Sequence, residues 1–561
     1  MNGPLEMWGG VECSHVRAGP IVRDQLSETG HLHRTEDLEL IAALGIRTLR
    51  YPVLWELVER TPGSYDWSWT DARLRRLREL GIEPVAGLLH HGSGPPWLDI
   101  LDPDFPGSFA RYAGAVAQRY PWLKLYTPIN EPLTTARLSG LYGLWHPHGS
   151  SEAICFQLTV AQCLATAWAM RAIRSLTPAA GLVQTEDVGR VFSTEALAYQ
   201  ADHENERRWL ALDLLAGRVD HRHPFHGRLL EAGVRAADLS SLAAEPCVPD
   251  MIGLDYYLTS DRMLDDNVDR YEHERVGGNG IDAYVDSAAV RSDRRQEAEL
   301  GHRIDEVWQR YGLPIAITEL HNGSTRDEQV RWLAEGWKAA QEARARGIDV
   351  RAVTAWSVFG AVDWNSLLTA RSGFYESGAF DVRGGVARPT ALAQTIAQLA
   401  ARGAVDHPVL DGRGWWREEH ASGTCDARPL LLVGFGRTIS TIEECCALRR
   451  LTVVAAAAAR VKASIADQRA WAAIRVEGQG SRKDAASTIR LVCHYPDSTE
   501  LLLQVNSTAP TIDMCHAFLD LVIDGERGSL EMLHSGPGNQ YSFGRLTIGT
   551  ERSVQAESFV A

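Results

Sequence analysis

The stretch Tyr126-Thr127-Pro128-Ile129-Asn130-Glu131-Pro132 decides the fold. A short apolar run leads into an Asn-Glu pair, and Pro132 ends the strand because proline has no amide hydrogen for a sheet. A second stretch, Pro314-Ile315-Ala316-Ile317-Thr318-Glu319, has the same form. Barrel enzymes carry their chemistry on the carboxyl ends of parallel strands. The two stretches therefore predict a barrel with Glu131 and Glu319 at its rim, and two such carboxylates are the minimum set for cleaving a glycosidic bond.

The length and the charge of the chain limit its class. With 561 residues it is too long for one ordinary domain, and a barrel of about 250–400 residues with a second unit is expected. The net charge of −15 disfavours nucleic acid or an anionic membrane as a partner. We recognise neither a secretory signal nor an apolar run of membrane-spanning length. The nine cysteines lack metal-ligand spacing, as in buried thiols of a reducing compartment, so we expect a cytoplasmic protein.

Short apolar runs alternate with amphipathic segments, which predicts an α/β fold, a (β/α)8 TIM barrel. The eight strands are expected near Glu6–Gly9, Thr48–Tyr51, Pro84–Leu89, Leu125–Asn130, Gly181–Thr185, Met251–Tyr256, Pro314–Glu319 and Val353–Ser357. Helices are expected at Trp69–Leu80, Phe105–Arg119, Glu152–Leu176, Arg326–Gly347 and Pro389–Gly403. The polar segment Thr259–Arg294 predicts a long loop after the sixth strand, and such loops build substrate clefts on barrels.

The pattern changes after Gly403, where we place the end of the barrel (residues 1–403). Residues 404–427 are rich in Gly, Asp, His and Trp and are interpreted as a linker. An apolar strand then enters a glycine turn at Arg428–Gly436, as at the start of a nucleotide-binding βα unit. The third glycine of that motif would fall at Ile439. We therefore expect a smaller, degenerate Rossmann-like α/β domain at residues 428–561.

Residues 1 to about 403 resemble the family 1 glycoside hydrolases, the β-glucosidase group. Thr127–Pro132 is similar to the family's T-x-N-E-P, and Ile317-Thr318-Glu319 is similar to its I-T-E strand. The resemblance implies that Glu131 is the acid/base catalyst and Glu319 the nucleophile. It also implies that Asn130 holds the 2-hydroxyl of the sugar.

Further matches are spread over the barrel. Arg50, in Leu49-Arg50-Tyr51, matches the arginine beside the nucleophile, and Tyr257 matches the tyrosine that hydrogen-bonds to it. The resemblance and the neighbouring residues give a substrate-binding set of His90, His91, Trp356, Asp363 and Trp364. Adjacent histidines on a strand point to opposite faces and rarely share one metal ion, so we expect no metal site and no cofactor. Trp145-His146-Pro147-His148 either lines the leaving-group side or is a solvated loop.

The sequence departs from the family where the family recognises its glycone. Gly10 aligns with the glutamine that holds the 3- and 4-hydroxyls, and Asp363 aligns with a longer glutamate that holds the 4- and 6-hydroxyls. Asp255 stands where asparagine is usual, and His321 follows the nucleophile strand in place of the family's Asn-Gly. The chemistry is therefore expected to be intact, while recognition of the sugar has been rebuilt.

The tail resembles a second family, the dTDP-4-dehydrorhamnose reductases. Its start at Arg428–Gly436 is similar to their glycine strand, and Ala517–Gly528 is similar to a segment near their C-terminus. The tail is too short for a whole reductase and lacks the Tyr-x-x-x-Lys pair of hydride chemistry. We therefore interpret it as a truncated reductase-like domain with a structural role.

These observations predict a retaining, exo-acting β-glycosidase that hydrolyses small β-glycosides by double displacement. A β-glucosidase is the first choice, with a β-galactosidase or a broad-specificity β-glycosidase as the alternative. The expected partner is a small-molecule β-glycoside or oligosaccharide. Two other classes stay open, an NAD(P)-dependent sugar-nucleotide reductase and a non-catalytic carbohydrate-binding barrel.

Overall fold

The structure is a computed structural model of the chain. It describes residues 3–271, 276–323, 326–371, 373–383, 385–417, 429–434, 436–448, 451–456, 465, 470–479, 488–495, 499–505, 515, 518, 519, 522 and 541–547.

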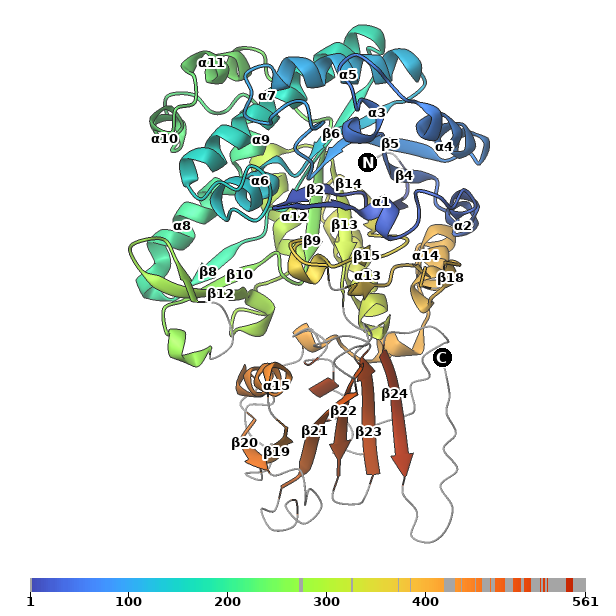
Figure 1. Ribbon diagram of the computed structural model, residues 1–561, viewed down its shortest axis with the longest axis vertical. Coiled ribbons are helices and arrows are strands. Elements are labelled where there is room, and N and C mark those ends of the chain that lie inside the picture. Colours follow the sequence, from blue (N-terminus) through green and yellow to red (C-terminus); the bar gives the residue numbers. More distant parts are fainter. Residues whose placement is uncertain are drawn as a thin grey trace.

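Eight parallel strands form a closed barrel (Figure 1). They are β1 (Glu6–Gly10), β4 (Thr48–Pro52), β5 (Glu83–His90), β6 (Leu125–Asn130), β7 (Gly181–Glu186), β9 (Met251–Tyr257), β13 (Ile315–His321) and β14 (Val350–Ala355). Around the barrel they follow the order β1-β14-β13-β9-β7-β6-β5-β4, and β1 closes it by pairing with both β14 and β4. All eight strands predicted from the sequence are confirmed, with ends displaced by a few residues at β14. The TIM barrel is therefore the fold of this part of the chain.

Helices surround the barrel, as expected for crossovers between parallel strands. The longer ones are α4 (Ser68–Glu79), α5 (Phe105–Arg119), α7 (Glu152–Leu176), α8 (Ala198–Arg207), α11 (Ala236–Ala244), α12 (Leu300–Tyr311), α13 (Arg326–Ala345) and α14 (Ala391–Arg402). Shorter ones are α1 (Gln25–Glu28), α2 (Asp37–Ala43), α3 (Trp55–Val58), α6 (Pro132–Ala136), α9 (Leu210–Leu215) and α10 (His226–Glu231). Buried apolar faces of these helices pack on the outside of the barrel. A separate cluster fills its interior with Trp8, Val85, Val183, Met251, Ala316 and Ala352, each from a different barrel strand.

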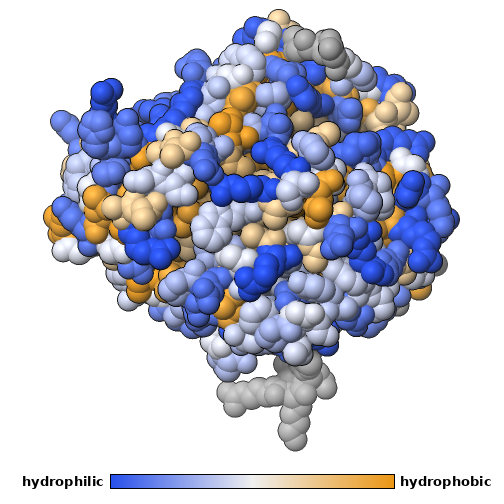
Figure 2. Space-filling view, turned by 90° about the horizontal axis from the view of Figure 1, so that it is seen from above, coloured by the Kyte–Doolittle hydropathy of each residue, from blue (hydrophilic) through white to orange (hydrophobic). Residues whose placement is uncertain are grey.

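Helix α7 is the longest of the surrounding helices. Ser151 caps its first turn by accepting a hydrogen bond from Ile154 N at 3.3 Å. Glu152–Leu176 is long and apolar enough to cross a membrane, which the sequence analysis did not recognise, but 72% of its most apolar window is buried inside the protein. It packs along α5 and α9 as a core helix. Figure 2 shows the face on the side of α5, α7 and α11 as mainly polar, with apolar residues in small scattered groups.

Thr259–Arg294 is the long connection expected after the sixth barrel strand, but it contains strands that the sequence analysis did not predict. This segment contains β10 (Arg262–Asp265), β11 (Val276–Gly278) and β12 (Ala283–Ala288), which form a sheet in the order β11-β12-β10-β8. The outer strand β8 (Val191–Ser193) comes from the loop after β7, and it pairs in parallel with β10. Neither loop alone shows this pairing, because each strand finds its partner in another part of the chain.

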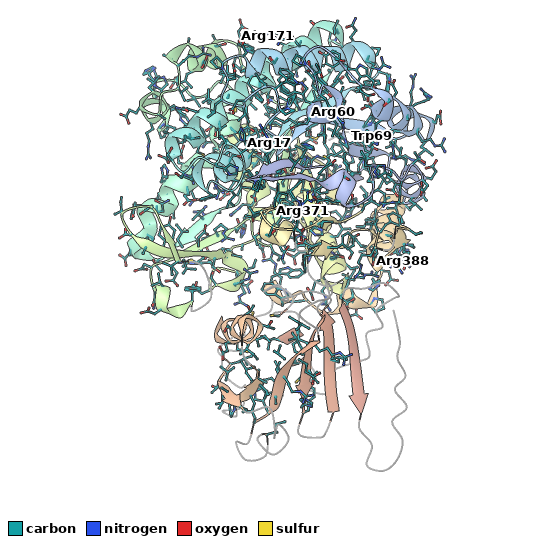
Figure 3. The ribbon with its side chains drawn as sticks, in the orientation of Figure 1. Arg17, Arg60, Trp69, Arg171, Arg371 and Arg388 are labelled. Carbon is teal, nitrogen blue, oxygen red and sulfur yellow. The ribbon has the colours of Figure 1, made fainter. Side chains whose placement is uncertain are left out.

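A hairpin follows β1 at the carboxyl end of the barrel. Its strands are β2 (His15–Ala18) and β3 (Ile21–Asp24). Arg17 Nε donates to Ser93 Oγ at 2.8 Å, in the loop after β5, and Arg371 donates to the carbonyl of Val22 at 2.9 Å. Figure 3 marks both arginines on the same side of the barrel. These bonds fix the hairpin over the barrel rim on which the predicted site lies.

Part of the segment interpreted as a linker packs on the barrel. Trp415 and Trp416 are buried in the main hydrophobic core, and the ring of Trp416 lies 5.3 Å from that of Trp332 in α13. Trp416 Nε1 donates to Glu335 at 2.8 Å, and Arg417 pairs with the same carboxylate at 2.6 Å. Residues as far as Arg417 therefore belong to the structural unit of the barrel. Residues 418–427 of the linker lie outside the described residues.

The tail contains a six-stranded sheet in the order β20-β19-β21-β22-β23-β24. Its elements are β19 (Leu430–Val433), α15 (Arg437–Leu448), β20 (Val453–Ala456), β21 (Ala472–Gln479), β22 (Thr488–His494), β23 (Thr499–Val505) and β24 (Tyr541–Thr547). The expected strand, glycine turn and helix are present, and Gly434 and Gly436 both have positive φ. Only β20, β19 and β21 are parallel, whereas β21 to β24 pair in antiparallel fashion, so just the opening of the domain is Rossmann-like. Most of Ala517–Gly528 lies outside the described residues.

The packing of Trp416 predicts a large loss of stability on truncation. Trp416→Ala is expected to lower the free energy of unfolding by about 3–5 kcal/mol, because it empties a fully buried site and leaves Glu335 with one donor fewer. Chemical denaturation of the whole chain measures this. Arg413→Ala, at an exposed position of the same segment, is the control and should change little. A small effect of Trp416→Ala would mean that residues 404–417 behave as a loose linker.

Candidate active site

The two predicted glutamates both lie at the carboxyl end of the barrel. Glu319 is the fifth residue of β13 and is 2% exposed, and Glu131 follows β6 directly and is 4% exposed. Glu131 has a φ of 43°, in the left-handed region that non-glycine residues rarely adopt. Such backbone strain costs about 1–3 kcal/mol and is concentrated at functional sites. Glu186 from β7 supports the turn by accepting from Leu133 N at 2.8 Å, at the first turn of α6.

Arg50, on β4, connects the strand ends. Its Nη1 donates to Glu319 Oε1 at 2.7 Å and to the Thr318 carbonyl at 2.8 Å. Its Nη2 donates to Asn130 Oδ1 at 2.5 Å. The guanidinium is permanently charged, and it lies against both the nucleophile candidate and the asparagine beside the acid candidate. The predicted position of Arg50 beside Glu319 matches the structure.

Tyr257, at the end of β9, donates its hydroxyl hydrogen to the other oxygen of Glu319. Burial, followed by the charge of Glu319, raises the pKa of Tyr257 well above its ordinary value. The phenol therefore stays protonated and remains a donor. With Arg50 on one oxygen and Tyr257 on the other, the Glu319 carboxylate is held in a single orientation.

The amide of Asn130 is oriented by two donors. Its Oδ1 accepts from Arg50 and also from Thr185 Oγ1, the latter at 2.7 Å. Because the oxygen is fixed in this way, the amide NH2 group must point the other way, where it lies 3.5 Å from His90 Nε2. Asn130 therefore presents a donor on the side of His90.

Glu131 has an environment that favours its protonated form. Burial raises its pKa well above the ordinary value, and the charge of Asp255, then that of Glu319, adds to this effect. Glu186 and Asp187 contribute in the same direction from β7 and the residue after it. The Arg50 guanidinium binds Glu319. The groups named above that act on Glu131 are, in contrast, all carboxylates. The surroundings of the two glutamates therefore differ, and those of Glu131 favour its protonated form.

His90 and His91 do not follow the expected alternation. His91 has a φ of 54°, and the turn brings its ring to 4.7 Å from that of His90 instead of onto the opposite face. Burial and the nearby charge of Arg50 lower the pKa of His91 to about 3. Its Nε2 lies 3.4 Å from Glu131 Oε2, and its Nδ1 lies 2.9 Å from Thr135 Oγ1. His91 is therefore neutral and touches the acid candidate directly.

Two tryptophans line the same region. Trp356, which follows β14, stacks on His90 at 5.5 Å and lies under the Arg50 guanidinium at 4.7 Å. Trp364 lies 5.7 Å from His91, and its indole N–H is buried without a protein partner. A buried donor of this kind is suited to a ligand hydroxyl. Trp145 is buried and lies 5.2 Å from His91, so the segment at Trp145–His148 begins inside the site.

Asp363 is engaged by protein groups. Its Oδ2 pairs with Arg23 at 2.9 Å, and its Oδ1 accepts from Phe374 N at 2.8 Å. Arg23 also pairs with Glu28. The shorter side chain therefore serves an internal ion pair at the position where the resemblance implied a contact with the sugar.

Sequence reasoning left several carboxyl groups of this region out of the site. Glu12 is 3% exposed, and burial raises its pKa to about 7. Asp255, on β9, accepts from Thr318 Oγ1 at 2.6 Å and has an Oδ2 without a protein partner. Burial, then the charge of Glu319, raises its pKa. Glu12 stands just beyond the end of β1, so the rule that identified Glu131 and Glu319 would have found it too.

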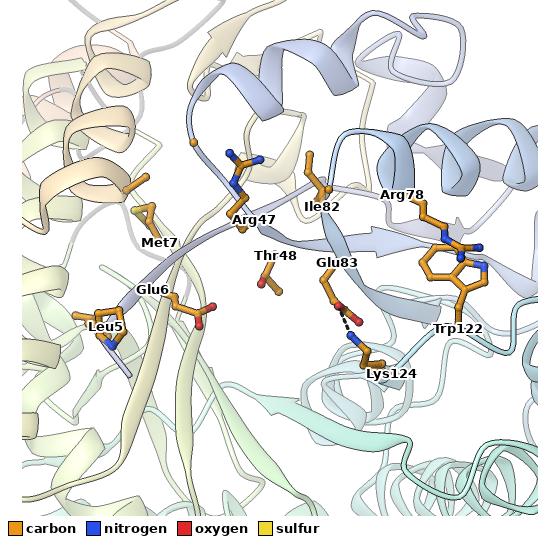
Figure 4. A pocket seen from close by; sticks show the side chains of 14 residues that line it. Leu5, Glu6, Met7, Arg47, Thr48, Arg78, Ile82, Glu83, Trp122 and Lys124 are labelled. Carbon is orange, nitrogen blue, oxygen red and sulfur yellow. Dashed lines mark hydrogen bonds and ion pairs between the residues drawn. The ribbon is translucent and has the colours of Figure 1, made fainter. Parts of the chain in front are cut away.

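A cavity of about 720 Å³ lies at the opposite end of the barrel, at the starts of β1, β4 and β5 (Figure 4). Its lining includes Glu6, Arg47, Thr48, Glu83, Trp122 and Lys124. Glu83 and Lys124 form an ion pair at 2.6 Å, which Figure 4 marks. None of the predicted site residues lines this cavity.

Metal ligands are not gathered in the part of the chain that the structure describes: no group of three or more His, Cys, Asp or Glu side chains could hold an ion there. The absence of a metal and of a cofactor stays a prediction. Eight cysteines lie in that part of the chain, and all are buried with free thiols, as expected from their spacing.

Comparison with known proteins places the barrel in a family. The model of Glycosyl hydrolase family 1 matches residues 23–378. Beta-glucosidase 47 of Arabidopsis thaliana is 23% identical over 386 residues, which cover 62% of this chain and 71% of the relative. Beta-glucosidase 4 of Oryza sativa subsp. japonica is 32% identical over 180 residues, 29% of this chain and 36% of the relative.

Solved structures agree on the fold. The family 1 β-glucosidase from Thermotoga maritima superposes with a TM-score of 0.58 at 16% identity, over 72% of this chain and 98% of that one. Virulence factor SghA from Agrobacterium tumefaciens gives 0.57 at 18% identity, over 72% of this chain and 97% of that one. The family match ends at residue 378, and these relatives give no support to a likeness between residues 428–561 and a dehydrorhamnose reductase.

Asp255 gives a testable prediction for the acid candidate. Asp255→Asn removes a negative charge near Glu131, so the ionised form of Glu131 becomes easier to reach and its pKa falls. A 13C NMR titration of the glutamate carboxyl groups measures this, with Glu131→Gln used to assign the signal. Asp349→Asn, in a surface pair with Arg351, is the control. A pKa of Glu131 that stays constant or rises in Asp255→Asn would contradict the described electrostatics.

Proposed function

Because the chain belongs to glycosyl hydrolase family 1, we propose that it is a retaining β-glycosidase that releases the non-reducing sugar of small β-glycosides by double displacement. The observation that carries the proposal is the contrast between two buried glutamates at one barrel rim. Glu319 is bound by Arg50 and Tyr257, whereas Glu131 lies among carboxylates that raise its pKa. A retaining glycosidase needs this combination of one ionised and one protonated carboxyl group.

In the first step, Glu319 attacks the anomeric carbon and forms a glycosyl ester. Arg50 donates to one oxygen of the carboxylate and Tyr257 to the other, which leaves the group one orientation for attack. At the same time the C–O bond to the leaving group breaks, and the proton of Glu131 passes to the departing oxygen. The leaving group then departs as a neutral alcohol.

In the second step, Glu131 acts as a base. Ester formation removes the charge of Glu319, one of the charges that raise the pKa of Glu131, so its pKa falls when a base is required. Glu131 takes a proton from water, and the water oxygen attacks the anomeric carbon. Glu319 leaves as a carboxylate, and the sugar is released with its original configuration.

The remaining groups position the sugar. Asn130 offers its NH2 group to the 2-hydroxyl, a contact that strengthens in the oxocarbenium-like transition state. Trp356 and Trp364 offer aromatic faces to the sugar ring. The indole N–H of Trp364 is a buried donor without a protein partner, and neutral His90 offers a ring nitrogen. Within the described residues these groups come from the ends of β5, β6 and β14, so they surround one place on the rim.

We propose β-glucosides as the preferred substrates, with β-galactosides second. Both curated relatives are named β-glucosidases, and SghA has been solved with a substrate analog, salicin. Asp363 is held by Arg23 and Phe374, so one of the groups that the family uses at the 4- and 6-hydroxyls is not free here. Weak discrimination at C4 is the expected consequence.

Removing the nucleophile gives the first test. Glu319→Gly should abolish hydrolysis of aryl β-glucosides, and added azide or formate should restore part of it by entering the space of the lost carboxylate. The product of azide rescue is a glycosyl azide, which NMR identifies. Glu245→Gly, at an exposed helix end, is the control and should keep full activity. Loss of activity in both variants, or none in either, would exclude Glu319 as the nucleophile.

A panel of aryl β-glycosides gives the second test. The wild type should hydrolyse glucosides and galactosides with kcat/KM values within about 10²-fold of each other, because a pocket that does not bind the differing hydroxyl discriminates weakly. Xylosides, fucosides and mannosides complete the panel. A preference of about 10⁴-fold or more between glucoside and galactoside would require a group that binds the 4-hydroxyl. Activity on none of the sugars would refute the proposed function.

A further inference from the structure

Residue 10, which aligns with the family's sugar-binding glutamine, has no room for a side chain, because Trp356 lies against β1 there. A Cβ atom on Gly10 would lie 2.3 Å from Trp356 Cε3 and 2.5 Å from its Cζ3. The indole of Trp356 therefore lies directly against the backbone of β1. It also contacts the Arg50 guanidinium and the ring of His90. A glutamine at residue 10 is incompatible with this position of the indole. Any polar group that β1 provides to the sugar must come from a later residue.

Glu12 is that residue. The chain continues along β4 past the end of β1, because Val11 N donates to the Arg50 carbonyl at 3.3 Å. Glu12 is 3% exposed, as deeply buried as Glu131 and Glu319 at 4% and 2%. Burial, with the charge of Glu319 adding to it, raises the pKa of Glu12, and the indole of Trp356 lies against Gly10, two residues earlier in the same segment. Glu12 therefore lies on the same wall as the nucleophile and the tryptophan.

The carboxyl group of Glu12 is held firmly but is not saturated. Its Oε1 accepts from Ser14 N at 2.9 Å and from Ser14 Oγ at 2.6 Å. These two bonds account for two of the roughly four acceptor positions that a carboxylate offers. A locked carboxylate with remaining acceptor capacity, next to an aromatic face, is a typical way to bind a sugar hydroxyl. No described cation forms a salt bridge with Glu12.

We propose that Glu12 is a specificity-determining residue of this site, which accepts a hydrogen bond from a ring hydroxyl of the glycone that lies on Trp356. The inference rests on the proposed glycosidase function and names the group that replaces the missing side chain of residue 10. The hydroxyl belongs to C3, C4 or C6, because Asn130 serves the 2-hydroxyl. The ligand class is a neutral pyranoside with a free hydroxyl at that position.

A series of deoxy substrates tests the proposal. We would measure kcat/KM of the whole chain for an aryl β-glucoside and for its 3-deoxy, 4-deoxy and 6-deoxy analogues. The wild type should lose about 10- to 100-fold on one analogue, as expected for a hydrogen bond to a charged group. Glu12→Ala should lose a similar factor on the parent glucoside and nothing further on that analogue, because the variant has already lost the bond. A merely structural role would lower all substrates equally.

Controls separate folding, binding and chemistry. Glu12→Gln keeps the size and an acceptor for Ser14, so it should fold even where Glu12→Ala does not, and it should weaken the same deoxy penalty. Glu6→Gln, at the other end of β1, should leave every ratio unchanged. Deoxy penalties that are the same in the wild type and in the Glu12 variants would overturn the proposal.

A binding measurement distinguishes this result from failure of the proposed function. Deoxynojirimycin, the ligand in one of the neighbouring structures, binds without turnover and is titrated by calorimetry. A wild type that hydrolyses no glycoside but binds deoxynojirimycin about 10-fold or more tightly than Glu12→Gln would refute the hydrolase function and keep the role of Glu12. Equal binding by both proteins would refute the role of Glu12.

Discussion

The site depends on one buried cation. Arg50 is 5% exposed, and a charge in such a place is stable only when it is paired and fully hydrogen-bonded. Its partners are Glu319, the Thr318 carbonyl and Asn130, which belong to β13 and β6. The same guanidinium that binds Glu319 therefore also fixes the orientation of the Asn130 amide. A change that moved Arg50 would disturb both strand ends at once.

The surrounding carboxyl groups exceed what this one cation can neutralise. Of Glu12, Glu131, Asp255 and Glu319, the last is hydrogen-bonded to Arg50 at 2.7 Å, and Asp255 forms a longer ion pair with it at 3.8 Å. Burial and mutual repulsion raise the pKa values of the other three, so each of them holds its proton up to a higher pH than an isolated carboxyl group does. Two glutamates with the same side chain therefore have different surroundings, and this difference underlies the roles that we propose for them. Glu131, the proposed acid, has several carboxylates as neighbours, whereas Glu319 is bound by Arg50.

The sequence was sufficient for what depends on local pattern. The barrel strands are short apolar runs with recognisable ends, and the positions of Glu131 and Glu319 at the barrel rim were predicted from two of these runs. The contacts that join separate parts of the chain were not predictable in the same way. The pairing of β8 with β10 joins two loops, and the ion pair of Asp363 with Arg23 joins residues 340 positions apart. His91 departs from strand alternation because its φ is left-handed, which no residue pattern at His90-His91 indicates.

Gly10 is a place where such a non-local contact determines which side chain the chain can carry. Once the Trp356 indole lies against the backbone of β1, residue 10 has room only for glycine, and the strand has no side chain to offer at that level. Glu12 then stands two residues further along the same segment, where the backbone N–H and the hydroxyl of Ser14 hold its carboxyl group. A carboxylate accepts but does not donate when ionised, whereas a glutamine amide does both. In its ionised form Glu12 would therefore restrict the proposed contact to an orientation in which the sugar hydroxyl donates, and this restriction follows from the packing of a tryptophan against a glycine.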